Sequence, residues 1–231
     1  MIRAVLFDFD GTLVDSEYLH HEAWLEAVAP WGVAVSWEVY VRRLVGISDL
    51  RACEFFLGMA GMEVTPEALE RGRSLKHRAY RARSVDELRI APQAIEWIVD
   101  NCGTVPMGVV SSSAVPDVVP ILERQGVARC MEFVVCGDHV ERLKPDPAPY
   151  RLALSKLDGA FGIRASRECL VFEDSSTGVR AASAAGMTVH ALGDAGELPA
   201  ALAEWDERIA RLDRFASCIP VGELQDFRAD R

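Results

Sequence analysis

Short apolar runs recur along the chain and have the length of buried strands. They are continuous rather than alternating, as in the strands of a parallel sheet that is covered on both faces. Four clear runs and a fifth expected one lie at 4–7, 105–110, 133–136, 169–172 and 187–192. Helical patterns separate the later runs, which predicts an α/β fold with a doubly wound, mainly parallel, Rossmann-like core sheet.

The helical patterns between these runs carry start and stop signals. Two begin near Pro92 and Pro147, and two others end at Gly126 and Gly186, where glycine is a common stop. The pattern that ends at Gly126 contains Pro120, which predicts a kink or a late start of that helix. A further helix is expected around 198–209.

Residues 15–88 interrupt this alternation, because helical patterns follow one another here without a convincing strand. Ser48 and Thr65 are typical helix starts, and Gly32, Gly46 and Gly61 are typical stops. We therefore expect an α/β catalytic core at 1–14 and 89–231 and an inserted, small, all-α cap domain at 15–88. The insert leaves and rejoins the core near the carboxyl end of the first strand, so it can cover a site there.

Composition narrows the class of protein. The 231 residues carry a formal net charge of -10, which argues against nucleic-acid and anionic-membrane partners. The six cysteines include no CxxC pair, and several lie in apolar runs, as expected in a reducing compartment. Neither a signal peptide nor a membrane span is evident, so we expect a cytoplasmic protein.

Polar residues follow four of the apolar runs directly. They are Asp8 and Asp10, Ser111 to Ser113, Lys144, and Glu173 with Asp174. Each set alone has a structural explanation: aspartates suit a turn before Gly11, serines suit a helix N-cap, and a lysine suits a solvated loop. Because ligands of open α/β sheets bind beyond the carboxyl ends of the strands, the four sets together predict one site.

The chemistry of this combined site favours phosphoryl groups. Several carboxylates at one rim require a hard cation, and Mg²⁺ takes carboxylate oxygens while keeping water and substrate phosphate as further ligands. Serine hydroxyls, N–H groups at a helix start and a lysine are suited to bind a phosphoryl anion.

Four motifs in this order resemble those of a haloacid dehalogenase-superfamily phosphohydrolase with a helical cap. The segments are DFDGTLVD, VVSSS, LKPDP and VFEDSSTG, and the resemblance runs from residue 4 to about 192. It implies an enzyme, a magnesium-dependent phosphatase that hydrolyses a small phosphorylated metabolite, a sugar phosphate-like monoester, through an aspartyl-phosphate.

The resemblance also implies a role for each matched residue. Asp8 would be the nucleophile and a metal ligand, and Asp10 the general acid/base whose backbone carbonyl also binds the metal. The remaining implied residues are Ser111, Ser112 and Lys144 for the phosphate, and Glu173 and Asp174 for the Mg²⁺ cofactor.

In the cap, His20 and Lys76 match positions at which beta-phosphoglucomutase-like members contact the substrate, although a partly buried or surface histidine and a solvated lysine would fit too. Those mutases have an arginine where this chain has Asp49, and a Lys-Asn pair where it has Ala114-Val115. Both departures remove groups that would bind a second phosphate. We therefore favour a phosphatase, with a phosphosugar mutase as the alternative.

Other classes fit less well. A dehalogenase of this fold would not need Asp10, and a phosphonate hydrolase would have a non-acidic residue there. A phospho-receiver domain would be about half as long and would lack the cap. A non-catalytic binding module stays open in principle, although every motif is intact. Sugar phosphates, phosphogluconate-like acids and nucleotides stay open as substrates, and a monomer is expected.

Overall fold

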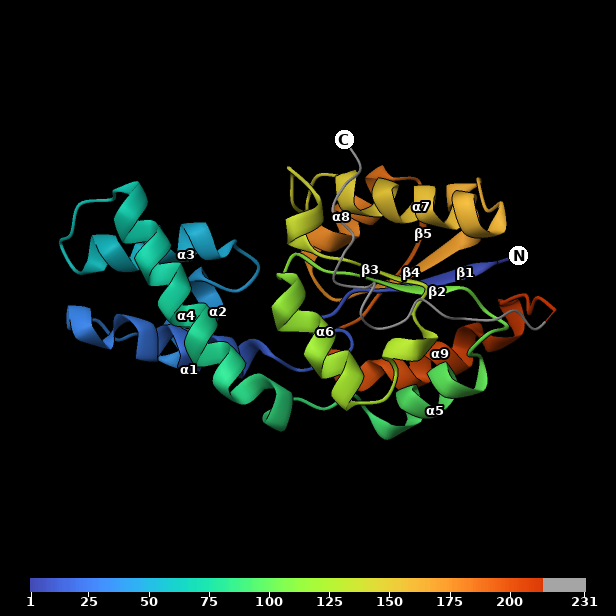
Figure 1. Cartoon of the computed structure of the whole chain (residues 1–231), viewed down its shortest axis with the longest axis horizontal. Coiled ribbons are helices and arrows are strands. Elements are labelled where there is room, and N and C mark those ends of the chain that lie inside the picture. The colour runs from blue at the N-terminus through green and yellow to red at the C-terminus, as the bar shows by residue number, and fades with distance from the viewer. Residues whose placement is uncertain (214–231) are drawn as a thin grey trace. The chain divides into compact units, whose positions relative to one another are not determined.

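The computed structural model describes residues 1–213 and divides into two compact units (Figure 1). One unit comprises Met1–Asp15 and the chain from Leu88 onward, and the other comprises Ser16–Glu87. The part of the expected core from residue 214 on, with Cys218, lies outside the described residues.

The first unit is built on a parallel sheet of five strands in the order β3-β2-β1-β4-β5. Their bounds are β1 Ala4–Phe7, β2 Met107–Val110, β3 Phe133–Val135, β4 Cys169–Glu173 and β5 Thr188–Ala191. The predicted α/β class and all five strands are confirmed. Every residue of the central strand β1 is buried, because helices cover both faces of the sheet, and this explains its continuous apolar run.

Five helices cover this sheet. Their bounds are α5 Pro92–Asp100, α6 Val115–Arg124, α7 Ala148–Phe161, α8 Ser176–Ala184 and α9 Leu198–Trp205. Short 3-10 turns lie at Ala128–Cys130, Gly137–His139, Ser166–Glu168, Ala195–Glu197 and Asp206–Arg208. Helices α7 and α8 lie on one face of the sheet, and α5, α6 and α9 lie on the other (Figure 1). Leu6, Leu157 and Val171 belong to the apolar cluster between the sheet and α7 and α8.

Helix α6 begins well before Pro120, so the predicted late start is wrong. Its first backbone N–H group, that of Val115, donates a hydrogen bond to Asp138 Oδ2 at 2.9 Å. Pro116 occupies the first turn, where the missing N–H of proline is tolerated. These two features fix the start of the helix ahead of the internal proline.

The side on which new strands join the sheet changes at β1. After β1 the chain adds β2 and β3 on one side, then crosses to add β4 and β5 on the other. Ligands of doubly wound sheets bind at such a switch point, outside the carboxyl ends of the strands. The residues that follow β1 and β4 therefore lie where the fold favours a site.

The second unit contains only helical elements among its regular structure. They are α1 Glu17–Val28, a 3-10 turn at Ala29–Trp31, α2 Trp37–Arg43, α3 Asp49–Met59 and α4 Pro66–Glu87. Ser48 caps α3 by accepting the N–H of Arg51, and the Thr65 hydroxyl accepts the N–H of Ala68 at the start of α4. A separate apolar cluster that includes Trp24 holds the four helices together.

Two further observations concern the thiols and the helices of the described residues. The cysteines of residues 1–213 carry free thiols, and burial raises the pKa of Cys169 to about 12, so that this thiol stays protonated. Within the same residues, no helix combines the length and the apolar composition needed to cross a membrane.

Candidate active site

Asp8 leaves β1 and opens a compact turn. Its backbone N–H donates to the carbonyl of Phe172 at 3.0 Å, which holds the end of β1 against β4. Gly11 has a φ of 79°, and a Cβ atom at this position would strike the Asp174 carboxylate. Both facts require glycine. The Asp-x-Asp-Gly segment is therefore a turn and part of the site at once.

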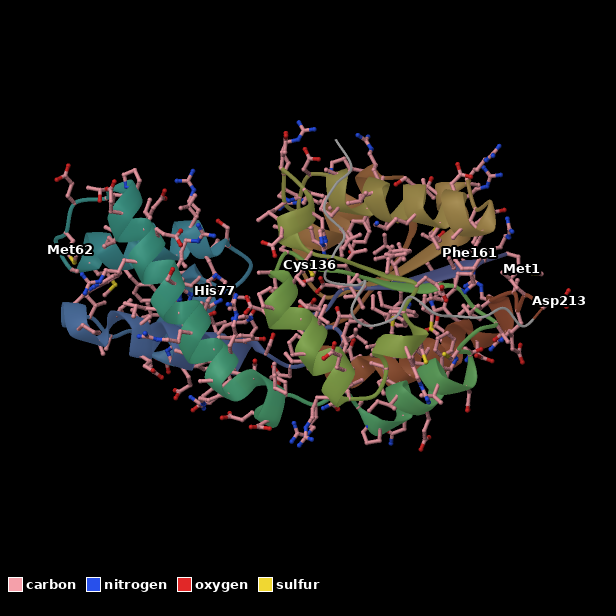
Figure 2. All side chains as sticks on the ribbon, viewed as in Figure 1. Met1, Met62, His77, Cys136, Phe161 and Asp213 are labelled. Atoms are coloured by element: carbon pink, nitrogen blue, oxygen red, sulfur yellow. The ribbon has the colours of Figure 1, made fainter. Side chains whose placement is uncertain are left out.

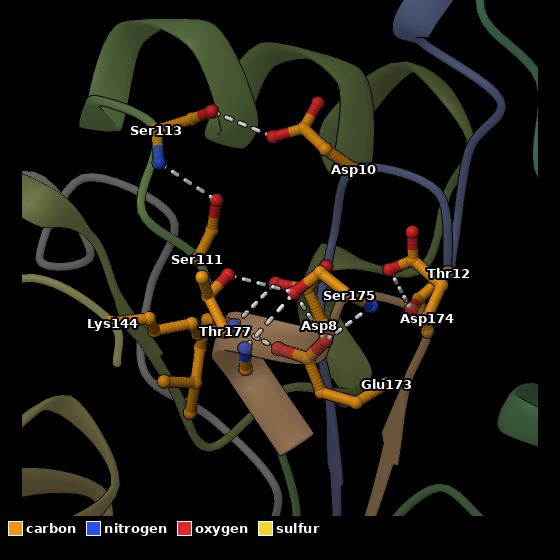
Figure 3. A network of polar contacts seen from close by, with 12 residues as sticks. Asp8, Asp10, Thr12, Ser111, Ser113, Lys144, Glu173, Asp174, Ser175 and Thr177 are labelled. Carbon is orange, nitrogen blue, oxygen red and sulfur yellow. Dashed lines mark hydrogen bonds and ion pairs between the residues drawn. The ribbon is translucent and has the colours of Figure 1, made fainter. Parts of the chain in front are cut away.

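Lys144 joins the ends of three strands (Figure 3). Its Nζ donates to Asp8 Oδ1 and to Glu173 Oε1, both at 2.5 Å, and to the carbonyl of Val110 at 2.8 Å. Its side chain is 4% exposed, so the expectation of a solvated loop charge is excluded. The structure thus brings together three residues that lie far apart in the sequence.

Glu173 is fully buried, and each of its carboxylate oxygens accepts two hydrogen bonds. Oε1 accepts from Lys144 and from the Tyr150 hydroxyl at 3.1 Å. Oε2 accepts from the N–H and the hydroxyl of Ser175, at 3.1 and 3.0 Å. This arrangement holds Glu173 in place and fixes Lys144 through it.

Tyr150 and Ser175 were not predicted as site residues. Ser175 is also the N-cap of α8, since its Oγ accepts the N–H of Gly178 at 3.0 Å. A serine directly before a helical pattern is a recognisable signal, so its position could have been found in the sequence. Tyr150 lies inside α7 with no local signal that distinguishes it from a core aromatic.

Asp174 lies beside Glu173 and is less buried. The Thr12 hydroxyl donates to its Oδ1 at 3.1 Å. Burial, together with the negative charge of Glu173, raises the pKa of Asp174 to about 6. The carboxylate therefore sits in surroundings that already hold negative charge.

Asp8, Glu173 and Asp174 form an acidic group that could hold a metal ion. Each offers one carboxylate oxygen, and these atoms lie within 4.8 Å of one another. Burial and the charge of Glu173 raise the pKa of Asp8 well above its usual range. Burial alone would lower the pKa of Lys144, but Asp8 and the other negative groups outweigh it and keep the ammonium charged. Three carboxylates against one ammonium leave a surplus of negative charge, and an all-oxygen set of this kind fits Mg²⁺.

The Asp10 carboxylate points toward the loop that follows β2 (Figure 3). Its Oδ2 accepts a hydrogen bond from the Ser113 hydroxyl at 2.6 Å. The N–H of Ser113 donates to Ser111 Oγ at 2.9 Å, and the N–H of Ser111 donates to the carbonyl of Val135 at 2.8 Å. Of the two serines predicted to bind phosphate, Ser111 is buried and Ser112 is exposed.

The second unit holds a polar cluster of its own, which contains both predicted cap residues. Lys76 is buried and its Nζ lies 2.9 Å from Asp49 Oδ2, while Nε2 of His77 lies 3.3 Å from the same oxygen (His77 is labelled in Figure 2). The ring of His20 stacks on Tyr80 with 4.3 Å between centroids.

Charge within this cap cluster is balanced around one carboxylate. Burial alone would raise the pKa of Asp49, but Lys76, His20 and His77 outweigh it and lower the pKa. Of the two interpretations of Lys76, the solvated helix charge is therefore excluded.

Comparisons with known proteins agree with the four sequence motifs that contribute the residues of the core site. Residues 5–192 match the family model of haloacid dehalogenase-like hydrolases. A fructose-1-phosphate phosphatase of Escherichia coli, YqaB, is 29% identical over 79% of this chain and 92% of its own length. A phosphoglycolate phosphatase of Yersinia pseudotuberculosis is 34% identical over 80% of this chain and 78% of its own.

A solved structure shares the fold as well. The structure of CbbY from Rhodobacter sphaeroides in complex with phosphate superposes with a TM-score of 0.70 at 27% identity. The match covers 83% of this chain and 87% of that one.

Proposed function

Because the chain belongs to the haloacid dehalogenase-like hydrolases, we propose that it is a magnesium-dependent phosphatase. In this proposal it hydrolyses a small phosphorylated metabolite, a sugar phosphate-like monoester, through an aspartyl-phosphate on Asp8. The observation that carries the proposal is the bridge from Lys144 to Asp8 and Glu173, with Asp174 beside them. It combines a nucleophile, a fixed positive charge and a cation-binding carboxylate set in one place.

The first step forms the phosphoenzyme. A carboxylate oxygen of Asp8 attacks phosphorus, a new P–O bond forms, and the bond to the ester oxygen breaks. The fixed ammonium of Lys144 offsets negative charge on the phosphoryl oxygens, which would otherwise repel the carboxylate. Ser111 and Ser112 would bind those oxygens from the loop after β2.

Asp10 moves the protons in both steps. It gives a proton to the departing ester oxygen, and then takes one from the water that attacks phosphorus and releases Asp8. Such proton transfer typically contributes about 10²- to 10⁴-fold in rate. The contact with Ser113 supports an Asp10 side chain that is held in one orientation.

The carboxylates of Asp8, Glu173 and Asp174, with the backbone carbonyl of Asp10, would hold the Mg²⁺ ion. When bound, the ion supplies positive charge against the substrate dianion and the surplus carboxylates. The raised pKa values of Asp8 and Asp174 support this assignment, because burial and the charge of Glu173 outweigh the Lys144 ammonium at both carboxylates.

In the cap, we assign His20 and Lys76 to the organic part of the substrate. Asp49 already compensates the charge of Lys76, so the pair offers one donor and one acceptor rather than a surplus positive charge. Ala114 and Val115 carry no side-chain donors. This combination suits hydroxyl groups better than a second phosphate, which favours a phosphatase over the mutase alternative.

The names of the relatives support a small metabolite as substrate, since the two relatives are phosphatases of fructose 1-phosphate and of phosphoglycolate. We further propose that the protein acts in the cytoplasm as a monomer. The free and mostly buried cysteines of the described residues support a reducing compartment.

Phosphate release from a panel of phosphorylated metabolites tests the proposal. We expect release with magnesium, loss of release after exhaustive chelation, and recovery when magnesium is added back. Full activity after chelation would contradict the magnesium dependence.

A second reaction separates the phosphatase from the mutase. With β-glucose 1-phosphate and a trace of glucose 1,6-bisphosphate, we expect free phosphate, if anything, and little glucose 6-phosphate. Efficient isomerisation without phosphate release would instead assign the mutase activity.

A further inference from the structure

We propose that Ser113 is a positioning residue for Asp10, an inference that rests on the proposed function. The Ser113 hydroxyl donates to Asp10 Oδ2 at 2.6 Å, a short distance that is typical of a charge-assisted hydrogen bond (Figure 3). The bond restricts rotation of the carboxylate.

The backbone of Ser113 is itself held in place through both its N–H group and its carbonyl group. Its N–H donates to Ser111 Oγ at 2.9 Å, and its carbonyl accepts the N–H of Gly137 at 2.9 Å. A Cβ atom on Gly137 would lie 2.5 Å from the carbonyl oxygen of Ser112, which is too close. Position 137, two residues after the end of β3, must therefore be a glycine for the serine loop to keep this path.

The far end of the same loop is fixed by the next residue. Asp138 Oδ2 accepts the N–H of Val115, where α6 begins. The loop between β2 and α6 is thus anchored to the end of β3 at two points. This anchoring carries the Ser113 hydroxyl to Asp10, which lies 103 residues earlier in the chain.

The hydrogen bond distinguishes Ser113 from a phosphate ligand. A serine hydroxyl has one hydrogen to donate, and a phosphoryl oxygen can only accept. A hydroxyl that donates to Asp10 cannot donate to the phosphate at the same time. The three serines of this loop therefore have different proposed roles. Ser111 and Ser112 bind the phosphate, and Ser113 orients the acid/base Asp10.

The test uses the dependence of rate on the leaving group. Ser113→Ala removes the bond, and we expect kcat for an alkyl phosphate to fall about 10- to 100-fold with KM nearly unchanged. With p-nitrophenyl phosphate, whose leaving group needs little protonation, the loss should be small. Ser113→Thr keeps the hydroxyl and should restore most of the rate.

Two further variants complete the set. Asp10→Asn should lose at least about 10²-fold with the same preference for the aryl substrate. Adding Ser113→Ala to Asp10→Asn should cause little further loss, because the group that Ser113 positions is already gone. The control is Ser155→Ala on the exposed side of α7, where the hydroxyl donates only to the carbonyl of Leu152 in its own helix, and it should leave both rates unchanged.

Wild-type activity decides the proposed function, and the ratio of alkyl to aryl losses decides this inference. Equal losses on both substrates with a raised KM would make Ser113 a phosphate ligand, and an unchanged Ser113→Ala enzyme would remove its role; either outcome overturns the proposal. If Ser113→Ala does not fold, Ser113→Cys replaces it, since the weaker thiol donor should give a smaller loss with the same selectivity.

Discussion

Lys144 in the core and Lys76 in the cap are both buried lysines that pair with an aspartate. Their side chains are 4% and 3% exposed, and their nearest carboxylate oxygens lie at 2.5 and 2.9 Å. The surroundings of the two pairs differ. Lys144 contacts two carboxylates and has Asp174 close by, whereas Lys76 shares the single carboxylate of Asp49 with His77.

The difference appears in the opposite pKa shifts of two aspartates. Asp174 in the core has its pKa raised to about 6, because burial and Glu173 disfavour its charge. Asp49 in the cap has its pKa lowered, because Lys76 and the nearby histidines outweigh burial. A surplus of like charge is typical of sites that must bind a cation or react, while a balanced pair requires neither. This difference supports the proposal that the core pair takes part in the chemistry and the cap pair in recognition of the substrate.

The largest expected difference between the two pairs comes from replacing the aspartate of each pair, Asp8 in the core and Asp49 in the cap, with asparagine. Asp8→Asn should abolish turnover, because an amide is a far weaker nucleophile than a carboxylate. Asp49→Asn should change kcat less than about tenfold, since it alters only the contacts of Asp49 with Lys76 and His77 within the cap. Steady-state phosphate release with saturating magnesium measures both. An Asp8→Asn enzyme with a near-normal rate would remove the covalent step.

Replacing the lysines gives the second contrast. Lys144→Met should lower kcat by about 10³-fold, as expected when a fixed charge that stabilises the reacting phosphoryl group is lost. Lys76→Met should act mainly on kcat/KM, and only for substrates with a polar organic part. The measurement is kcat/KM for a sugar phosphate against an aryl phosphate in each variant. A loss of similar size on both substrates for Lys76→Met would contradict its role in recognition.

Much of the core could be predicted from the sequence because its signals are local. The apolar run 4–7 ends in Asp8, and parallel topology sends every such strand end to one edge of the sheet. Lys144 and Glu173 could therefore be placed at one rim before their contacts were known. The bonds of Tyr150 and Ser113 could not be predicted, because they depend on packing between α7, the serine loop and distant strands.

In the cap, less of the site than in the core could be predicted from the sequence. Ser48 and Thr65 could be identified as helix starts from their types and positions. The pairing of Asp49 with Lys76 could not, because the start of α3 and the middle of α4 are 27 residues apart and no motif joins them. Helix periodicity fixes which residues share a face, but not which faces meet. For Pro120 the local signal left a kink or a late start open, and the structure excludes the late start because α6 begins at Val115.

The last and smallest contrast concerns stability of the metal-free protein. The folded-state pKa of Asp174 is raised from 3.8 to about 6, so the folded chain binds its proton more tightly than the unfolded chain. Stability from this group is therefore present below about pH 4 and is lost as the pH rises through about 6. The shift corresponds to about 3 kcal/mol. In EDTA, Asp174→Asn should thus be more stable than wild type at pH 8 and no more stable at pH 4, since the amide oxygen can still accept from Thr12.

Asp49→Asn should show the reverse sign. The pKa of Asp49 is lowered in the folded state, so its stabilisation is present above its unfolded value of 3.8 and is lost as the pH falls through the folded value. The variant should be less stable than wild type at pH 8, by about 2 kcal/mol for a partly exposed pair with a buried lysine, and the difference should shrink toward pH 3. Urea unfolding in EDTA across this pH range measures the stability of both variants. In a separate series at pH 8 with magnesium in place of EDTA, the ion should stabilise wild type more than Asp174→Asn. If Asp174→Asn and Asp49→Asn destabilise the protein alike at pH 8, the core has no surplus of charge, and the contrast between the two lysines fails.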